Sequence, residues 1–197
     1  MPPRTRRAYA VLLGAVAGLD EELASEVSLL GALGAVDEIH VWASSQDAEA
    51  IRALVSTNSW EKVVAMNAAR PTRDATIFDA LTVISRTAGD KDLVLIADAG
   101  QPSLTEPAVS SCLSVAAEQG AAMLASRVTG DVVHVDGSGR ITWLPPTDST
   151  LVAAGLLVAQ FSRLFDLYDW ASTVAAGAVQ APYRWSLARL GASVVVS

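Results

Sequence analysis

The chain has 197 residues, which is enough for one domain with a sizeable hydrophobic core. Hydrophobic residues make up 51% of it and charged residues 18%, a composition that excludes a disordered protein. The formal net charge of -7 disfavours nucleic acids and anionic membranes as partners, because like charges repel one another.

The N-terminal segment has two interpretations. Arginines at positions 4, 6 and 7 precede the apolar run 9–18, and Ala15-Val16-Ala17 resembles a signal-peptidase site, so the segment has the outline of a secretory signal. The other interpretation is a buried first strand over Ala8–Gly14. We favour the strand, because the following segments continue an alternation of strands and helices that would otherwise lack its first member. No other apolar run is long and uncharged enough to cross a bilayer.

Apolar strand-like runs alternate with segments of helical periodicity. The predicted strands are 8–14, 38–43, 62–66, 92–97 and 121–126, and the predicted helices between them are 20–34, 47–55, 71–87 and 106–119. A β-hairpin is predicted from 132–135 and 141–144, which flank Asp136-Gly137-Ser138-Gly139. Residues 156–167 are predicted to be mainly helical, and 169–197 to be helical with a last strand at 194–196.

This alternation predicts an α/β protein with a three-layer sandwich, a mostly parallel sheet and a hairpin arm at about 128–150, all in a single domain over 1–197. Ligands of such sheets bind beyond the carboxyl ends of the strands. The segments to inspect for a site are therefore 14–18, 68–76, 98–102 and 129–131.

Cys112 is the only cysteine, so an internal disulfide is excluded. It lies in the apolar stretch 108–117, which is predicted to be helical, and we interpret it as a small buried side chain rather than a nucleophile. An unpaired thiol suits a reducing compartment, and we expect a cytoplasmic protein.

Three of the strand ends carry residues with a candidate role. The glycines of Gly14-Ala15-Val16-Ala17-Gly18 could let backbone amides approach a phosphate, and a plain tight turn explains them equally well. Asp98 could hold Mg²⁺ together with phosphate oxygens, or cap the turn that follows it. Thr72 and Asp74 fit helix-capping roles, and Thr76 could cap or offer a hydroxyl to a base or sugar. His40 and His134 have no partner at metal-ligand spacing, and no Gly-x-Ser-x-Gly turn suggests a hydrolase.

Four segments together resemble one family, the 2-C-methyl-D-erythritol 4-phosphate cytidylyltransferases. Val94–Val109 is similar to the family's strand that ends in Asp-Ala-Ala-Arg-Pro, and Thr72–Ile77 resembles its Thr-Arg-Gln-x-Ser-Val. Val128–Thr142 resembles the family's arm, and Thr147–Leu157 stands where the family has Asp-Arg-x-Gly-Leu-Trp. The likeness extends over roughly residues 9–174.

The resemblance implies a nucleotide-diphospho-sugar-transferase-like sandwich that binds CTP and Mg²⁺ and forms a homodimer through its arm. In the family, the phosphate of methylerythritol phosphate attacks the α-phosphate of CTP. The residues implied to contact the nucleotide are Gly14, Ala15, Gly18, Arg73, Thr76, Asp98 and Ala99, with Asp98 also at the metal.

The chain departs from the family where the chemistry needs positive charge. Asp20-Glu21-Glu22 replaces the start of the loop that carries arginine and lysine. Further replacements stand at Gln101, Val133, Asp148 and the Ala69-Arg70 pair. The only lysines, Lys62 and Lys91, are predicted to lie at the opposite ends of the strands.

Two hypotheses follow. The first is a non-catalytic relative that keeps the fold, has lost the triphosphate site and associates through its arm with itself or with an active cytidylyltransferase subunit. It rests on the size of the loss, since removing one oxyanion-type donor commonly lowers a rate ~10²–10³-fold. The alternative is an active nucleotidyltransferase that uses CTP or another NTP with Mg²⁺ and a different acceptor.

Overall fold

The computed structural model describes residues 6–15, 20–58, 60–100, 104–127, 134–135, 141–143, 151–174 and 190–196. The elements are, in chain order, β1 (Ala8–Ala15), α1 (Asp20–Ala32), β2 (Glu38–Ala43), α2 (Ala48–Asn58), β3 (Val63–Ala68), α3 (Arg73–Ile84), β4 (Leu93–Asp98), α4 (Glu106–Gln119), β5 (Ala121–Arg127), β6 (His134–Val135), β7 (Ile141–Trp143), β8 (Leu151–Gln160), α5 (Phe161–Val174) and β9 (Ser193–Val196).

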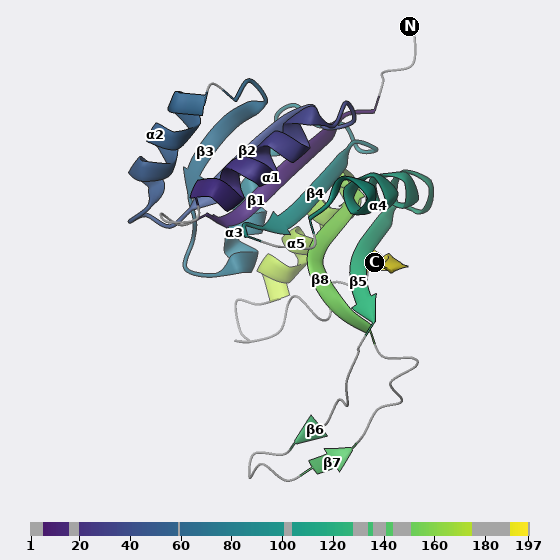
Figure 1. The fold of residues 1–197 in the computed structure, drawn as a ribbon. Coiled ribbons are helices and arrows are strands. Elements are labelled where there is room, and N and C mark those ends of the chain that lie inside the picture. The colour runs from purple at the N-terminus through teal and green to yellow at the C-terminus, as the bar shows by residue number, and fades with distance from the viewer. Residues whose placement is uncertain are drawn as a thin grey trace, which may run out of the picture.

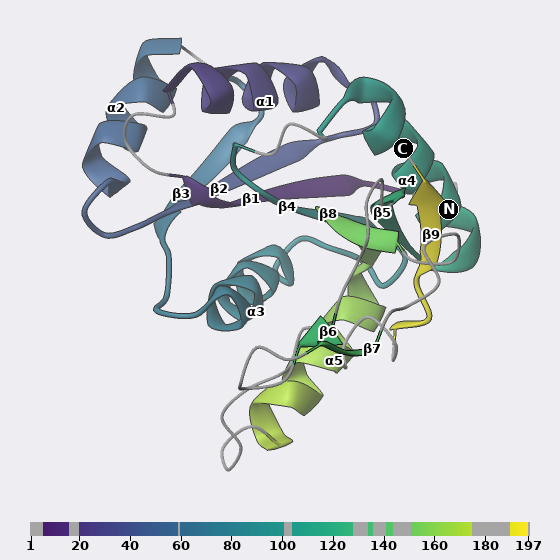
Figure 2. The same cartoon turned by 60° about the horizontal axis from the view of Figure 1, so that its bottom comes forward.

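Seven of the strands form one sheet in the order β3-β2-β1-β4-β8-β5-β9, which is parallel except for β8. Helices α1, α2 and α4 cover one face of this sheet, and α3 and α5 cover the other (Figures 1 and 2). The predicted three-layer, mostly parallel α/β sandwich is thus confirmed. Strands β6 and β7 pair in a separate two-stranded sheet, as the predicted hairpin requires.

The core lies in two layers because strand residues alternate between the two faces of the sheet. Ala10 and Leu12 of β1 pack under α1, whereas Val11 and Leu13 pack toward α3. All four side chains are at most 3% exposed. Such burial on both faces explains why β1 is a continuous apolar run with no polar alternation.

Strand β1 decides between the two interpretations of residues 8–14, a secretory signal and a first strand of the sheet. It lies between β2 and β4 and pairs with both in parallel register. The segment is therefore a central strand of the sheet, as the first-strand interpretation predicted. Within the described ranges, the chain has no helix with the length and hydrophobicity needed to cross a membrane.

The helix predicted over 156–167 is wrong for residues 156–160 and confirmed for 161–167. Residues Leu151–Gln160 form β8, which is antiparallel to both β4 and β5, and α5 begins only at Phe161. Leu156 and Val158 are buried on one face of the sheet and Leu157 on the other. Because both faces of β8 are covered, its sequence here is an unbroken apolar run. Such a run cannot be distinguished from a buried helix by periodicity alone.

The remaining C-terminal prediction is confirmed in part. Helix α5 continues to Val174, and the last strand β9 begins at Ser193, one residue before the predicted 194–196. Residues 175–189, which were also predicted to be helical, lie outside the described residues.

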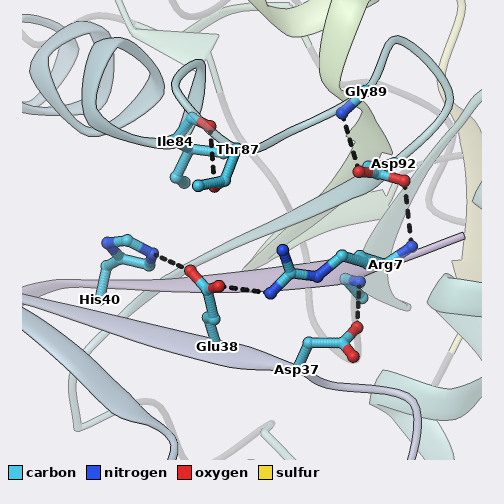
Figure 3. A network of polar contacts seen from close by, with 9 residues as sticks. Arg7, Asp37, Glu38, His40, Ile84, Thr87, Gly89 and Asp92 are labelled. Atoms are coloured by element: carbon cyan, nitrogen blue, oxygen red, sulfur yellow. Dashed lines mark hydrogen bonds and ion pairs between the residues drawn. The ribbon is translucent and has the colours of Figure 1, made fainter.

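A network of polar contacts fixes the amino-terminal edge of the central strands (Figure 3). The carboxylate of Asp92 accepts hydrogen bonds from the backbone N–H groups of Arg7 (3.0 Å) and Gly89 (2.8 Å). Asp37 accepts one from the N–H of Ala8 at 2.8 Å. The Arg7 guanidinium pairs with Glu38, so β1 is tied to both of its neighbours at this edge.

Candidate functional site

The candidate site begins where β1 and β4 end side by side. Leu13 is the register partner of Asp98, and the N–H of Ala99 donates to the carbonyl of Leu13 at 2.7 Å. Gly14 follows with φ of 71°, at an irregularity in the pairing of β1 with β2. A residue with a Cβ rarely adopts this left-handed conformation, so the irregularity near the end of β1 favours glycine. The structure thus brings Gly14, Ala15, Asp98 and Ala99 to one point, as the topology predicted.

Arg73 reaches this point from the start of α3. Its Nε donates to one carboxylate oxygen of Asp98 at 2.9 Å, and its Nη2 donates to the other at 3.3 Å. The two side chains are 31% and 37% exposed, so water has access to the pair. Arg73 and Asp98, which were predicted separately as nucleotide contacts, therefore form one bidentate ion pair.

This ion pair bears on the predicted metal site. Mg²⁺ on Asp98 would need a carboxylate oxygen, and both oxygens accept hydrogen bonds from Arg73. Among the described residues, no group of three histidine, cysteine or acidic side chains could hold a metal ion. The side chains at this point therefore do not fit a metal cation as they are arranged, and a metal would require Arg73 to release Asp98.

Thr76 lies in α3 and is 3% exposed. Its hydroxyl accepts a hydrogen bond from the backbone N–H of Arg70 at 2.9 Å and donates to the carbonyl of Thr72 at 3.0 Å. The Thr72 hydroxyl accepts from the N–H of Ala75, which confirms its predicted capping role. Thr76 thus organises the turn before α3, an arrangement that favours its structural role over contact with a base or sugar.

A second ion pair lies in the same region. The Arg70 guanidinium pairs with the carboxylate of Asp79 in the middle of α3.

Asp74, at the start of α3, accepts a hydrogen bond from the Tyr168 hydroxyl at 3.4 Å. Burial raises the pKa of Asp74, while Arg73 and the Tyr168 hydrogen bond act in the opposite direction. Sequence reasoning missed the partners Asp79 and Tyr168, because no spacing rule connects them to the residues that they contact.

The comparisons with known proteins agree on one family. A profile of the 2-C-methyl-D-erythritol 4-phosphate cytidylyltransferases matches residues 16–170. The chain belongs to this family.

Solved structures of family members have the same fold. The 4-diphosphocytidyl-2C-methyl-D-erythritol synthase of Anaerococcus prevotii aligns with a TM-score of 0.76 and 15% identity, over 97% of this chain and 87% of its own. The 2-C-methyl-D-erythritol 4-phosphate cytidylyltransferase of Thermus thermophilus aligns with a TM-score of 0.66 and 19% identity, over 95% of this chain and 86% of its own. The enzyme of Francisella tularensis aligns with a TM-score of 0.65 and 18% identity, over 96% of this chain and 89% of its own. No curated protein matches the sequence significantly.

This member of the cytidylyltransferase family carries acidic residues near the carboxyl edge of the sheet. Glu21 and Glu22 are exposed in the first turn of α1, the element that follows β1 in the chain. Lys62 and Lys91 precede β3 and β4, so they lie at the opposite edge, as predicted.

Some predicted positions lie outside the described residues. They are Gly18 of the first loop, Gln101 after β4, the arm residues 129–131 and Val133, and Asp148. Their predicted roles stay predictions.

Proposed function

We propose that this chain keeps the cytidylyltransferase fold without the family's cytidylyl-transfer activity. The observation that carries the proposal is that both described arginines near the candidate site are paired with aspartates. Arg73 is held by Asp98, and Arg70 by Asp79. Each pair has no net charge to offer a triphosphate.

Positive charge is needed for cytidylyl transfer, because attack on an α-phosphate depends on positioning and on stabilising a highly charged transition state. The chain has Glu21 and Glu22 where the resemblance implies the start of a basic loop. These side chains would repel phosphate rather than bind it. Losing one donor commonly lowers a rate ~10²–10³-fold, and several losses around one triphosphate leave little catalysis.

A protein that keeps this fold without the activity can still bind another protein chain through its arm. The β6–β7 hairpin is separate from the main sheet (Figure 1) and belongs to the arm through which the resemblance implies dimerisation. We expect a homodimer, or a complex with an active cytidylyltransferase subunit, and no binding to nucleic acid or membrane. Light scattering of the purified chain, and co-purification with a catalytic family member, test these two outcomes. The expected location is the cytoplasm, a proposal that the unpaired buried thiol of Cys112 supports.

The activity itself can be measured directly. The chain and an active family enzyme are incubated with CTP, Mg²⁺ and methylerythritol phosphate, and pyrophosphate release is followed. We expect a rate at least ~10³-fold below that of the active enzyme. A comparable rate would overturn the proposal.

One observation supports the alternative, an active nucleotidyltransferase with a different acceptor. Asp98 is 37% exposed and lies beside the end of β1, where Gly14 has a left-handed conformation, so a ligand can reach it. Thermal-shift measurements with CTP, UTP, ATP and GTP in the presence of Mg²⁺ separate the two functions. Stabilisation by a nucleotide that disappears in Asp98→Ala would favour the alternative, with Mg²⁺ as its cofactor.

A further inference from the structure

A cavity of about 280 Å³ lies on the far side of the molecule from Asp98. Its walls come from α1, the first buried residue of β2 and the segment 60–62 that leads into β3. It is therefore at the amino-terminal edge of the sheet, whereas the candidate site is at the carboxyl edge. Its volume is close to the lower limit of ordinary small-molecule pockets, about 300 Å³.

The walls of the cavity are partly polar and partly apolar. Val27 and Ile39 lie beneath it in the hydrophobic core and are 1% and 0% exposed, so they offer a ligand almost no accessible surface. The partly buried indole of Trp60 packs against the same core. Gly31 of α1 lines the cavity as well, and a Cβ built on it would meet no atom within 4 Å. Absence of a side chain at Gly31 thus leaves room beside the indole of Trp60.

One fixed cation lines the same cavity. The Nζ of Lys62 donates to the carbonyl of Leu33, just after α1, at 2.8 Å, which holds the ammonium in place. An ammonium has three N–H donors, so further hydrogen bonds can form. In the part of the chain that the structure describes, no carboxylate forms an ion pair with Lys62.

The polar rim favours an anion over a cation. Glu61 also lines the cavity, but it is exposed, so water and salt screen its charge. Lys62 is partly buried and anchored, so its charge acts in a less screened environment and needs little reordering to bind. A ligand carboxylate should therefore be attracted to Lys62 more strongly than Glu61 repels it.

We propose that this cavity binds a small molecule with one aromatic ring and one carboxylate. The ring packs against the accessible part of the Trp60 indole in the open space beside Gly31, and the carboxylate accepts a hydrogen bond from Lys62. This binding does not depend on the proposed function, because the cavity and the Asp98 site share no residue.

Three probes of similar size and different charge test the proposal. Benzoate, benzamide and benzylamine are titrated into the ¹⁵N-labelled chain, and the indole N–H signal of Trp60, assigned with Trp60→Phe, is followed by NMR. We expect the affinity to fall from benzoate to benzamide to benzylamine. Binding of benzylamine as tight as that of benzoate, or no shift of the Trp60 signal with benzoate, would overturn the proposal.

Matched variants locate the site and its charge. Gly31→Leu should fill the cavity and weaken benzoate binding at least about tenfold, whereas Gly31→Ala, which adds only a Cβ, should change it less. Lys62→Met should weaken benzoate about tenfold and leave benzamide unchanged, and Lys62→Arg should restore benzoate binding. Thermal melting verifies that each variant is folded. Benzoate binding that is unchanged in both Gly31→Leu and Lys62→Met would contradict the assignment.

Discussion

Arg73, the first residue of α3, donates hydrogen bonds to both carboxylate oxygens of Asp98 at the end of β4. The guanidinium thus lies where a cation bound to Asp98 would have to be. Removing it in Arg73→Ala should make the carboxylate available to Mg²⁺. At a Mg²⁺ concentration near the dissociation constant, we expect stabilisation of about 0.4 kcal/mol, or about 1–2 °C in Tm. Thermal melting with and without Mg²⁺ measures it.

Two variants control this experiment. Arg70→Ala removes the other paired arginine near the site and should give no Mg²⁺ response, because Asp79 rather than Asp98 loses its partner. Adding Asp98→Asn to Arg73→Ala should abolish the response. A Mg²⁺ response in the unmodified chain as large as in Arg73→Ala would show that Arg73 does not compete with a metal.

The position of this ion pair was only partly predictable. The sequence places Asp98 after the strand 92–97 and Arg73 at the start of a helix, and parallel topology brings such ends to one edge of the sheet. The two residues are 25 positions apart, and no periodicity connects them. That they bind each other depends on how α3 packs on the sheet, which local sequence rules do not determine.

The missed strand β8 has a similar cause. Along β1, β4 and β5 the sequence alternates with helices, and these parallel strands were predicted close to their observed bounds. β8 lies between β4 and β5 and runs antiparallel, so it breaks that alternation. Residues 156–159 are all buried and offered no period that separates a strand from a helix.

His40 should make stability depend on pH. It is 3% exposed, and burial lowers its pKa, while Glu38, whose Oε2 is 3.4 Å from Nε2, acts in the opposite direction (Figure 3). The unfolded chain therefore binds a proton near pH 6.5 that the folded chain does not. Stability is retained above pH 6.5 and falls as the pH decreases below it, by at most about 1.4 kcal/mol per pH unit for one proton.

Urea unfolding between pH 7.5 and 5.5 measures this effect. His40→Leu removes the titrating group and keeps a buried apolar side chain, so its free energy of unfolding should decrease less over this range. Parallel curves for the two proteins would show that His40 does not cause the pH dependence.

Cys112 should be unreactive in the folded chain. It is fully buried in α4, and burial raises its pKa from 9.0 to about 11. This rise in pKa leaves about a hundredfold less thiolate at pH 8, and the thiolate is the reactive form. We expect a thiol reagent such as DTNB to label the chain only in denaturant. Rapid labelling of the native chain would contradict both the burial and the raised pKa.

Two glycines should respond in opposite directions to the same substitution. Gly14→Ala forces a Cβ into the left-handed conformation at φ of 71° and should lower the free energy of unfolding by about 1–2 kcal/mol. Gly31 lies within α1 with open space where a Cβ would be, so Gly31→Ala should raise it by about 0.5–1 kcal/mol. Urea unfolding of the two variants compares them directly. A Cβ built on Gly14 would meet no atom within 4 Å, so a loss of stability in Gly14→Ala would reflect backbone strain rather than a steric clash. If Gly14→Ala is as stable as the unmodified chain, the end of β1 does not need a left-handed residue at position 14.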